Sequence, residues 1–236
     1  MHNYTSQFIP ARELSPPDAE RMLALYESLY VLPNREIFWK DLAAKNEVLL
    51  LRSSGELVGF TTVQIYDFHF HGIRRNIVFS GDTVVHRDHW GQQVLARSWI
   101  TRIGQLQRQE PNVPIYWFLV VKGHRTYRFL PAFCTRFFPH WEQSTPELKA
   151  LADALAEDHF GSHYDASSGL IRYPESRGHL KAAIAQPTEA ERRLPAVAYF
   201  LERNPGYLQG HEMVCLFEFT EAAMRPLTQR LFRSGG

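Results

Sequence analysis

The chain has 236 residues, of which 44% are hydrophobic and 22% charged, so it can bury a substantial core. Lys and Arg total 26 against 25 Asp and Glu, and this near balance argues against non-specific nucleic-acid binding and against an electrostatic membrane-surface role. With no apolar run of membrane-spanning length, no signal-peptide pattern and two cysteines, we expect a soluble protein of a reducing cytoplasm.

The first part of the chain predicts a strand, two helices and an antiparallel meander of three strands. Ser15 precedes Pro16 and Pro17, a combination typical of a helix start, and apolar residues then recur at three- and four-residue spacing. Gly81 lies inside the last strand of the meander, where a glycine indicates a β-bulge or a close backbone approach. The predicted elements are a strand over 8–14, helices over 15–30 and 37–42, and strands over 47–52, 57–66 and 76–86.

The rest of the chain predicts a long helix, a buried strand and a mainly helical extension. The segment 113–121 is almost entirely apolar, which is typical of a central strand with both faces covered. Residues 161–178 are rich in Gly, Ser and Pro and predict an irregular segment. The predicted elements are a helix over 91–109, a strand over 113–121, helices over 125–137, 147–158 and 189–202, a turn over 204–206 and a final strand over 212–220.

This order of elements predicts an α+β (mixed α/β) fold with a central, mostly antiparallel sheet flanked by helices. The meander is followed by a strand–helix–strand crossover of the usual right-handed kind. We expect a core over residues 1–145 and a mainly helical C-terminal extension over 146–236 that ends in a strand. The extension should pack on the core, because a lone strand must join a sheet to satisfy its backbone groups.

Residues 84–95 connect the meander to the long helix and read Val-Val-His-Arg-Asp-His-Trp-Gly-Gln-Gln-Val-Leu. Together with the order of elements over residues 7–140, this segment resembles the GNAT superfamily of acyl-CoA N-acyltransferases. In that family a strand with a Val-x-Pro-like end leads to a Gln/Arg-x-x-Gly-x-Gly/Ala loop that opens a helix. Gly91 fits the extended glycine-rich pattern, whereas Trp90 stands at the Gln/Arg position, and Gln93 and Leu95 stand at the two small positions.

The resemblance implies that the acyl group arrives as a pantetheine thioester, either of coenzyme A or of an acyl carrier protein. Backbone N–H groups at a helix N-terminus bind the pyrophosphate of coenzyme A, and glycines permit its close approach. Because Gln93 and Leu95 carry side chains, we expect free coenzyme A to bind weakly. The residues that the resemblance assigns to the cofactor are Val84, Val85, Trp90, Gly91, Gln92, Gln93 and Thr126, the last at a position where the family has an Asn.

Asp82 is the candidate general base, since a carboxylate beside an amine-binding cleft can take the proton of an attacking ammonium. The alternative is a carboxylate that only hydrogen-bonds backbone beside Gly81. The family's Tyr, which protonates the leaving thiolate, aligns with Phe133, so Tyr127 and His124 are the nearest substitutes as an acid. Both also suit structural roles, Tyr127 in packing and His124 in a loop.

Neither the cysteines nor the histidines predict a second reactive site. Cys134 lies in a predicted aromatic helix, where a buried thiol is inert. His69 and His71 share one face of a strand, but the predicted hairpin puts His86 roughly 30 Å away along the strands, too far to share a metal ion. We therefore expect no metal site.

The favoured interpretation is a GNAT-like enzyme that transfers an acyl group to an amine of a small-molecule acceptor by direct attack. Backbone N–H groups around Val85 would polarise the thioester carbonyl, as the resemblance implies. We expect the strand ending at Val85 and the strand over 113–121 to splay apart and open a cleft. The alternative is a non-catalytic binding or regulatory module that has lost the acyl-CoA chemistry. An acyl carrier protein and a second copy of the chain remain open as partners, whereas nucleic acid and membranes are not expected.

Overall fold

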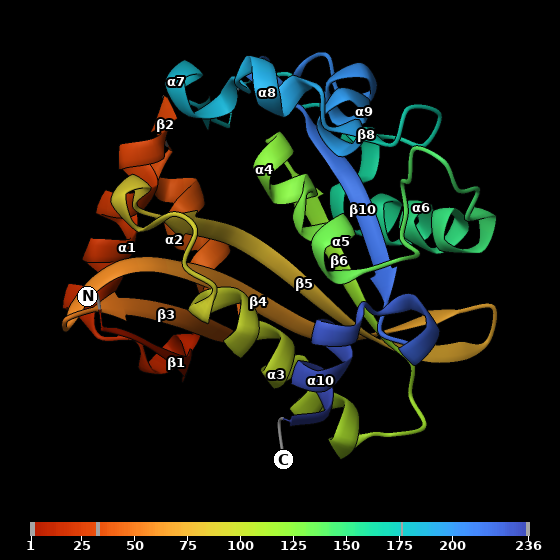
Figure 1. The fold of residues 1–236 in the computed structure, drawn as a ribbon, viewed down its shortest axis with the longest axis horizontal. Coiled ribbons are helices and arrows are strands. Elements are labelled where there is room, and N and C mark those ends of the chain that lie inside the picture. Colours follow the sequence, from red (N-terminus) through yellow and green to blue (C-terminus); the bar gives the residue numbers. More distant parts are fainter. Residues whose placement is uncertain (1–2, 32–33, 176, 235–236) are drawn as a thin grey trace.

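The computed structural model describes residues 3–31, 34–175 and 177–234 as a central sheet with helices on both faces (Figure 1). The sheet has eight strands in the order β1-β3-β4-β5-β6-β10-β8-β7, and among these described neighbours β5 and β6 form the one parallel pair. β2 and β9 form a separate two-stranded ribbon. The strands are β1 (Tyr4–Pro10), β2 (Tyr30–Val31), β3 (Glu47–Ser53), β4 (Glu56–Phe70), β5 (Ile73–Val85), β6 (Ile115–Val121), β7 (Tyr164–Asp165), β8 (Leu170–Ile171), β9 (His179–Leu180) and β10 (Glu212–Glu218). The predicted α+β class, with a mostly antiparallel sheet flanked by helices, is confirmed.

The helices begin where the sequence supplies capping groups. Ser15 Oγ accepts a hydrogen bond from Asp18 N at 3.2 Å, and Asn34 Oδ1 accepts one from Ile37 N at 3.0 Å, so each satisfies an N–H that the first turn leaves free. The helices are α1 (Pro16–Leu29), α2 (Arg35–Ala43), α3 (Val94–Gln109), α4 (His124–Tyr127), α5 (Phe129–Phe133), α6 (Pro146–Phe160), α7 (Ala182–Ala185), α8 (Glu189–Arg192), α9 (Pro195–Arg203) and α10 (Pro226–Ser234).

Alternation along the strands divides the core into two faces. Leu49 and Leu51 of β3 belong to the cluster under α3, whereas Val48 and Leu50 belong to the cluster under α1 and α2. Farther along the sheet, Ile77 on β5 and the apolar side of α6 form a third cluster, with β6 and β10. α1, α2 and α6 therefore cover one face, and α3 lies on the other.

A β-bulge interrupts the pairing of β4 with β5 at Gly81, as predicted. The register passes from Thr61↔Thr83 to Val63↔Ser80, so Gly81 and Asp82 together face Thr62. A Cβ atom added at Gly81 would lie 2.5 Å from Thr62 Oγ1, which explains why this position has no side chain. The bulge turns the chain just before β5 ends.

β5 and β6 pair only over part of their length. Their register runs from Asn76↔Ile115 to Ser80↔Leu119 and stops there. Beyond Ser80, β5 continues beside β4 while β6 continues beside β10, and Figure 1 shows the two strands diverging. The predicted splay is therefore present, and it starts at the bulge.

The extension contributes strands to the main sheet. β10 pairs antiparallel with β6 from Met213↔Val121 to Glu218↔Tyr116, and β8 and β7 follow it at the edge. The prediction of an irregular segment over 161–178 is wrong here, since short strands in that stretch complete the edge of the sheet. The C-terminal helix α10, which the sequence did not predict, crosses α3 so closely that a Cβ at Gly104 would lie 1.9 Å from Phe232 O.

Several predicted boundaries are wrong for identifiable reasons. The helix over 125–137 is two short helices, because Cys134 and Phe138 leave helical geometry to make bridges with Met224 and Leu216. The helix over 189–202 is divided into α8 and α9 before Pro195. The first strand begins at Tyr4 rather than Phe8, and it ends where β3 begins to pair with it.

Candidate active site

A pocket of about 280 Å³ lies where β5 and β6 part; we call it the divergence pocket. Its core walls come from α1, α2, β5, β6 and the turn after β6. The extension adds His159, Phe160, Tyr173, Arg177, Leu180 and Glu212. Aromatic rings and ionisable groups thus line one small space, and residues far apart in the sequence complete it.

Asp82 is the half-buried carboxylate of this pocket, presented by the bulge. The ion pairs of the described residues include none to Asp82. Burial is the largest influence and raises the pKa of Asp82 to about 6; Asp41 and Glu212 add to the rise, while Lys122 and Lys45 oppose it. The carboxylate can therefore take up and release a proton near neutral pH.

Two ion pairs flank Asp82. Lys122 Nζ lies 3.1 Å from Glu212 Oε1, joining the end of β6 to the start of β10. Lys45 Nζ lies 2.8 Å from Asp41 Oδ1, and only 1% of the Lys45 side chain is exposed. Burial alone lowers the pKa of Lys122, but the nearby Glu212 carboxylate and other acidic groups reverse this and raise the pKa well above its usual value. Both lysines are therefore cations near neutral pH, each held beside an acid.

Tyrosines from α1 complete the charged end of the pocket. Burial, reinforced by the negative charge of Asp82, raises the pKa of Tyr26 to about 12, and burial also raises the pKa of Tyr30. The two rings stack with centroids 4.3 Å apart, and Lys122 Nζ lies 5.5 Å from the Tyr30 ring. Both phenols therefore keep their protons near neutral pH.

The backbone of β5 beyond the bulge alternates between two neighbours. Val84 pairs with Phe60, and His86 N donates to Val58 O, so the N–H groups of Thr83 and Val85 point away from β4. The Val84 side chain is fully buried under α1 and α2. Of the two predicted valines, Val85 thus turns backbone groups toward β6, whereas Val84 uses its own in the sheet.

The loop before α3 is capped by its own side chains. Gly91 adopts a φ of +86°, which favours glycine, and Gln92 Oε1 accepts from Leu95 N at 3.1 Å. Gln93 Oε1 accepts from Arg97 at 2.8 Å. Leu95 is 6% exposed and packs in the core, so its side chain points away from any phosphate and the expected obstruction at Leu95 is wrong.

Trp90 lies across the mouth between the two diverging strands. Its indole Nε1 donates to Val85 O at 2.9 Å, and the Arg125 guanidinium of α4 lies 5.0 Å from its ring centroid. Since Trp90 follows β5 and Arg125 follows β6, this contact joins the two arms; we call it the Trp90–Arg125 bridge.

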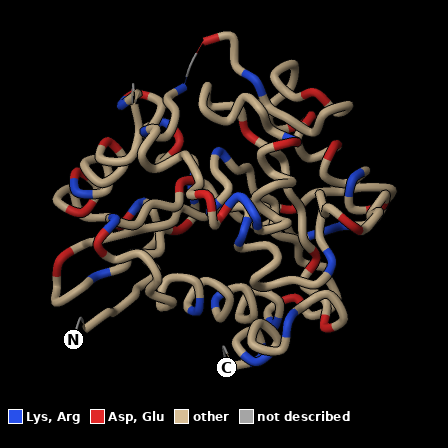
Figure 2. Tube along the Cα trace, turned by 45° about the horizontal axis from the view of Figure 1, so that its top comes forward, with Lys and Arg blue, Asp and Glu red and all other residues tan. Residues whose placement is uncertain are grey.

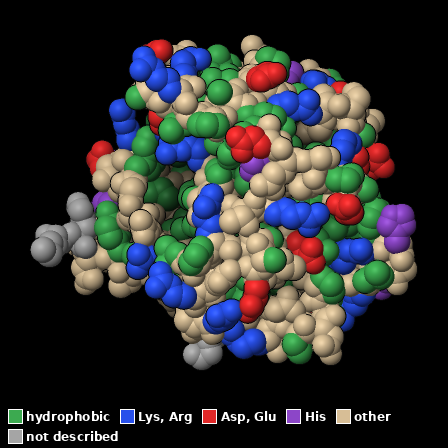
Figure 3. Space-filling view, turned by 45° about the vertical axis from the view of Figure 1, so that its right-hand side comes forward, with side chains coloured by type: hydrophobic (Ala, Val, Ile, Leu, Met, Phe, Trp, Pro, Cys, Tyr) green, Lys and Arg blue, Asp and Glu red, His purple; other side chains and the backbone are tan. Residues whose placement is uncertain are grey.

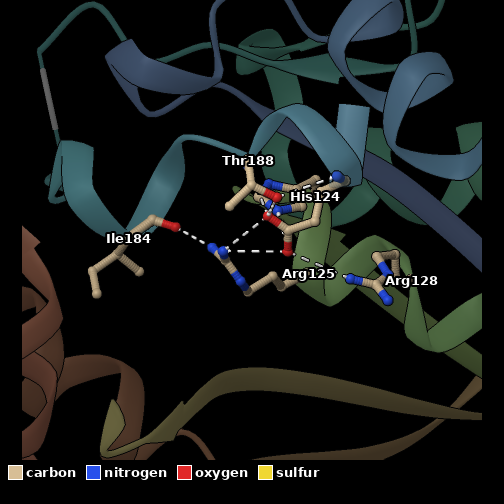
Figure 4. A network of polar contacts seen from close by, with 6 residues as sticks. His124, Arg125, Arg128, Ile184 and Thr188 are labelled. Carbon is tan, nitrogen blue, oxygen red and sulfur yellow. Dashed lines mark hydrogen bonds and ion pairs between the residues drawn. The ribbon is translucent and has the colours of Figure 1, made fainter. Parts of the chain in front are cut away.

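Arg125 is in turn held by the extension (Figure 4). It donates to Ile184 O and lies 3.4 Å from Glu191, whose carboxylate also lies 3.6 Å from Arg128 and 3.7 Å from His124 Nε2. Glu191 also accepts from Thr188 N at 2.8 Å in a capping box. Burial and the neighbouring Arg125 lower the pKa of His124, so its imidazole is neutral near pH 7.

The three residues predicted from the turn after β6 have different surroundings. Thr126 lines the divergence pocket. The Tyr127 hydroxyl is buried and donates to Pro139 O at 2.7 Å, and burial raises its pKa. His124 is 1% exposed beside Glu191. The structure thus brings Thr126 and Asp82 into one pocket, and it gives Tyr127 and His124 structural partners instead.

Two other expectations concern thiols and metals. Cys134 is fully buried, and burial raises its pKa well above its usual value, although it lies in an extended bridge rather than in a helix. Among the described residues, no group of three His, Cys, Asp or Glu side chains is arranged to hold a metal ion.

Sequence reasoning missed most of the polar residues around Asp82. Asp41, Lys45, Lys122 and Glu212 were not singled out, although a charge directly after an apolar strand, as at Lys122, is a usable signal. The position of Glu212 beside Lys122 depends on β10 pairing with β6, which sequence patterns do not specify.

Charges of both signs are spread along the described chain, without a single-sign stripe (Figure 2). The face in Figure 3 likewise mixes cationic, anionic and hydrophobic side chains, and a hollow is edged by hydrophobic and cationic groups. Every helix in the described ranges is too short or too polar to span a bilayer.

No family model matches the chain, and no curated protein matches it. Solved structures match part of it: a protein of unknown function from Enterococcus faecalis V583, described as a probable N-acyltransferase, shows 14% identity and a TM-score of 0.42 over 56% of this chain and 33% of that chain. Escherichia coli ElaA shows 20% identity and a TM-score of 0.43 over 61% of this chain and 94% of its own. An acyl-CoA N-acyltransferase from Pseudomonas aeruginosa shows 18% identity and a TM-score of 0.41 over 56% and 88%. These likenesses are partial, so the function has to be inferred from the site.

Proposed function

We propose that this chain is a GNAT-type acyltransferase that moves an acyl group from a pantetheine thioester to the amine of a small acceptor in the divergence pocket. The observation that supports this most strongly is Asp82, which the bulge presents at the parting of β5 and β6 with a pKa raised to about 6. A general base is most effective when its pKa lies near the working pH.

The reaction follows from the groups around the pocket. Asp82 takes a proton from the acceptor's ammonium, and the freed nitrogen attacks the thioester carbonyl carbon. The C–N bond forms, the carbonyl oxygen becomes negative, and the C–S bond then breaks to release a thiolate and leave an amide. The N–H groups of Thr83 and Val85, which point away from β4, are suited to stabilise the oxyanion. A thiolate with a pKa of about 8.5 can take its proton from water, so the reaction needs no acid at Tyr127 or His124.

The acyl donor carries the pantetheine arm that coenzyme A and acyl carrier proteins share. Gln92 already occupies Leu95 N, and the Trp90–Arg125 bridge joins the arms at the mouth. These contacts leave little of the first turn of α3 for a pyrophosphate, so a carrier protein, bound partly through protein contacts, is the favoured donor.

The same bridge supports a second candidate, a non-catalytic binding module. If the Trp90–Arg125 bridge stays closed, the pocket can hold a small amine while no thioester reaches Asp82. The two candidates differ in a single observable, the release of thiol that depends on an amine.

The test is thiol release from octanoyl-coenzyme A and from octanoyl-phosphopantetheinyl carrier protein, with an amine panel and mass spectrometry of the amide product. The Asp82→Asn variant should lose about 10²–10⁴-fold in rate, the contribution of a general base. Glu142→Gln, which changes an exposed carboxylate away from the pocket, is the matched control. Binding of amines without any amide product would favour the non-catalytic module.

A further inference from the structure

Arg177 is a cation of the divergence pocket that the proposed reaction does not use. It is an exposed lining residue, so it lies at the rim, and the described ion pairs include none to it. Its guanidinium carbon lies 3.8 Å from the centroid of the Tyr173 ring. A guanidinium stacked in this way keeps its N–H donors, which lie in the plane at its edge, available for a carboxylate.

Tyr173 connects this rim cation to the charged interior. It lines the same pocket, and its phenol is close enough to Glu212, Lys122 and Asp41 to experience their charges. The charges in the interior are arranged differently: Lys122 is paired with Glu212 and Asp41 with Lys45, which leaves Asp82. The pocket thus has an unpaired anion inside and an unpaired cation at its rim.

The walls between these two charges are apolar. Phe38, Phe79 and Trp117 line the pocket, and a space of about 280 Å³ is at the small end for a ligand site. A ligand that fits has a cationic end for Asp82, a small apolar or aromatic body, and an anionic end for Arg177.

Resting on the proposed function, we propose that the acyl acceptor is a free amino carboxylate with an apolar or aromatic body, whose ammonium faces Asp82 and whose carboxylate is bound by Arg177. Arg177 is then a specificity residue of the acceptor. The carboxylate stays at the solvent-exposed rim, where its desolvation is small, while the amine reaches the thioester carbonyl.

Phenylalanine and phenethylamine are the matched probes, because they share the amine and the ring and differ in the carboxylate. With the full-length protein and a fixed acyl donor, phenylalanine should have the lower KM by about tenfold, the effect of a hydrogen-bonded charged group. Arg177→Gln should raise the KM of phenylalanine about tenfold and leave that of phenethylamine and the kcat unchanged. Arg177→Lys should recover part of the loss, and the exposed Arg193→Gln should change neither KM.

Calorimetric binding of the same two probes separates this inference from the proposed function. Preferential binding of phenylalanine that Arg177→Gln abolishes, without amide formation, would support the inference and overturn the proposed acyl transfer. Equal KM values and equal binding for both probes, unaffected by Arg177→Gln, would overturn the inference even if transfer occurs. A change confined to the KM of the acyl donor would also overturn it, because Arg177 would then bind the donor's phosphate.

Discussion

The two sides of the cleft between β5 and β6 are built differently. The acceptor side, the divergence pocket, combines an unpaired carboxylate, two flanking ion pairs and aromatic walls, and the extension supplies part of its lining. The donor side, from Val85 to the start of α3, has side chains bonded to each other and to the backbone. The extension reaches this side only indirectly, through its hold on Arg125.

This difference indicates which part of the reaction has been kept. A pocket with a carboxylate whose pKa is near 6 is prepared for proton transfer, whereas a loop capped by Gln92 and bridged by Trp90 is not open for a phosphate. We infer that the chain has retained the chemistry at the acceptor and changed how it holds the donor.

Removal of the extension should have the largest effect. A chain that ends at Thr145 loses β10, so β6 loses a neighbour along its length and the pocket loses Arg177 and Glu212. We expect this shortened chain to lack a cooperative unfolding transition in circular dichroism and calorimetry. A shortened chain as stable as the full one would show that the extension is an independent domain.

The ion pair between Lys122 and Glu212 should give the next largest effect. Lys122→Met leaves a Glu212 carboxylate, whose side chain is 8% exposed, without its partner, and should cost about 3 kcal/mol of unfolding free energy in urea. The double variant Lys122→Met/Glu212→Gln should recover most of this loss. As a control, Arg136→Met breaks the exposed pair with Glu147 and should cost less than about 1 kcal/mol. Equal losses in both single variants would contradict a buried pair.

The donor side should respond to Trp90. Trp90→Ala removes the stacking on Arg125, worth about 0.5–1 kcal/mol at an exposed site, and should tighten coenzyme A binding about threefold in calorimetric titration. Leu194→Ala, another exposed apolar residue, is the control. Unchanged or weaker binding would mean that the Trp90–Arg125 bridge does not close the mouth.

The fold could be predicted where local patterns and tertiary structure agree. The turn at Ser54 and Gly55, both with positive φ, joins two alternating strands as expected, and the bulge at Gly81 follows from a glycine inside a strand. The segment over 125–137 has a helical pattern, but backbone bridges from Met224 and Leu216 draw Cys134 and Phe138 out of it. Such long-range pairing overrides local propensity.

The site shows the same limit. Asp82 was predictable because it lies beside the bulge, whereas Lys122 and Glu212 meet only because β10 pairs with β6. Tyr127 was a reasonable substitute acid by chemistry, but its hydroxyl is bonded to Pro139 O in the folded chain. Residue type could therefore suggest the chemistry, while the partners of each group depended on contacts between distant segments.

The pH dependence of kcat/KM for amine-dependent thiol release tests the central claim, general-base catalysis by Asp82, most directly. Burial raises the pKa of this carboxylate to about 6, so it is protonated below that pH and cannot accept the ammonium proton. We expect kcat/KM to rise with pH through an apparent pKa of about 6 in the unmodified protein and in Glu142→Gln, and this limb to disappear in Asp82→Asn together with most of the rate. Full activity in Asp82→Asn, or an unchanged limb near pH 6 in that variant, would contradict the claim.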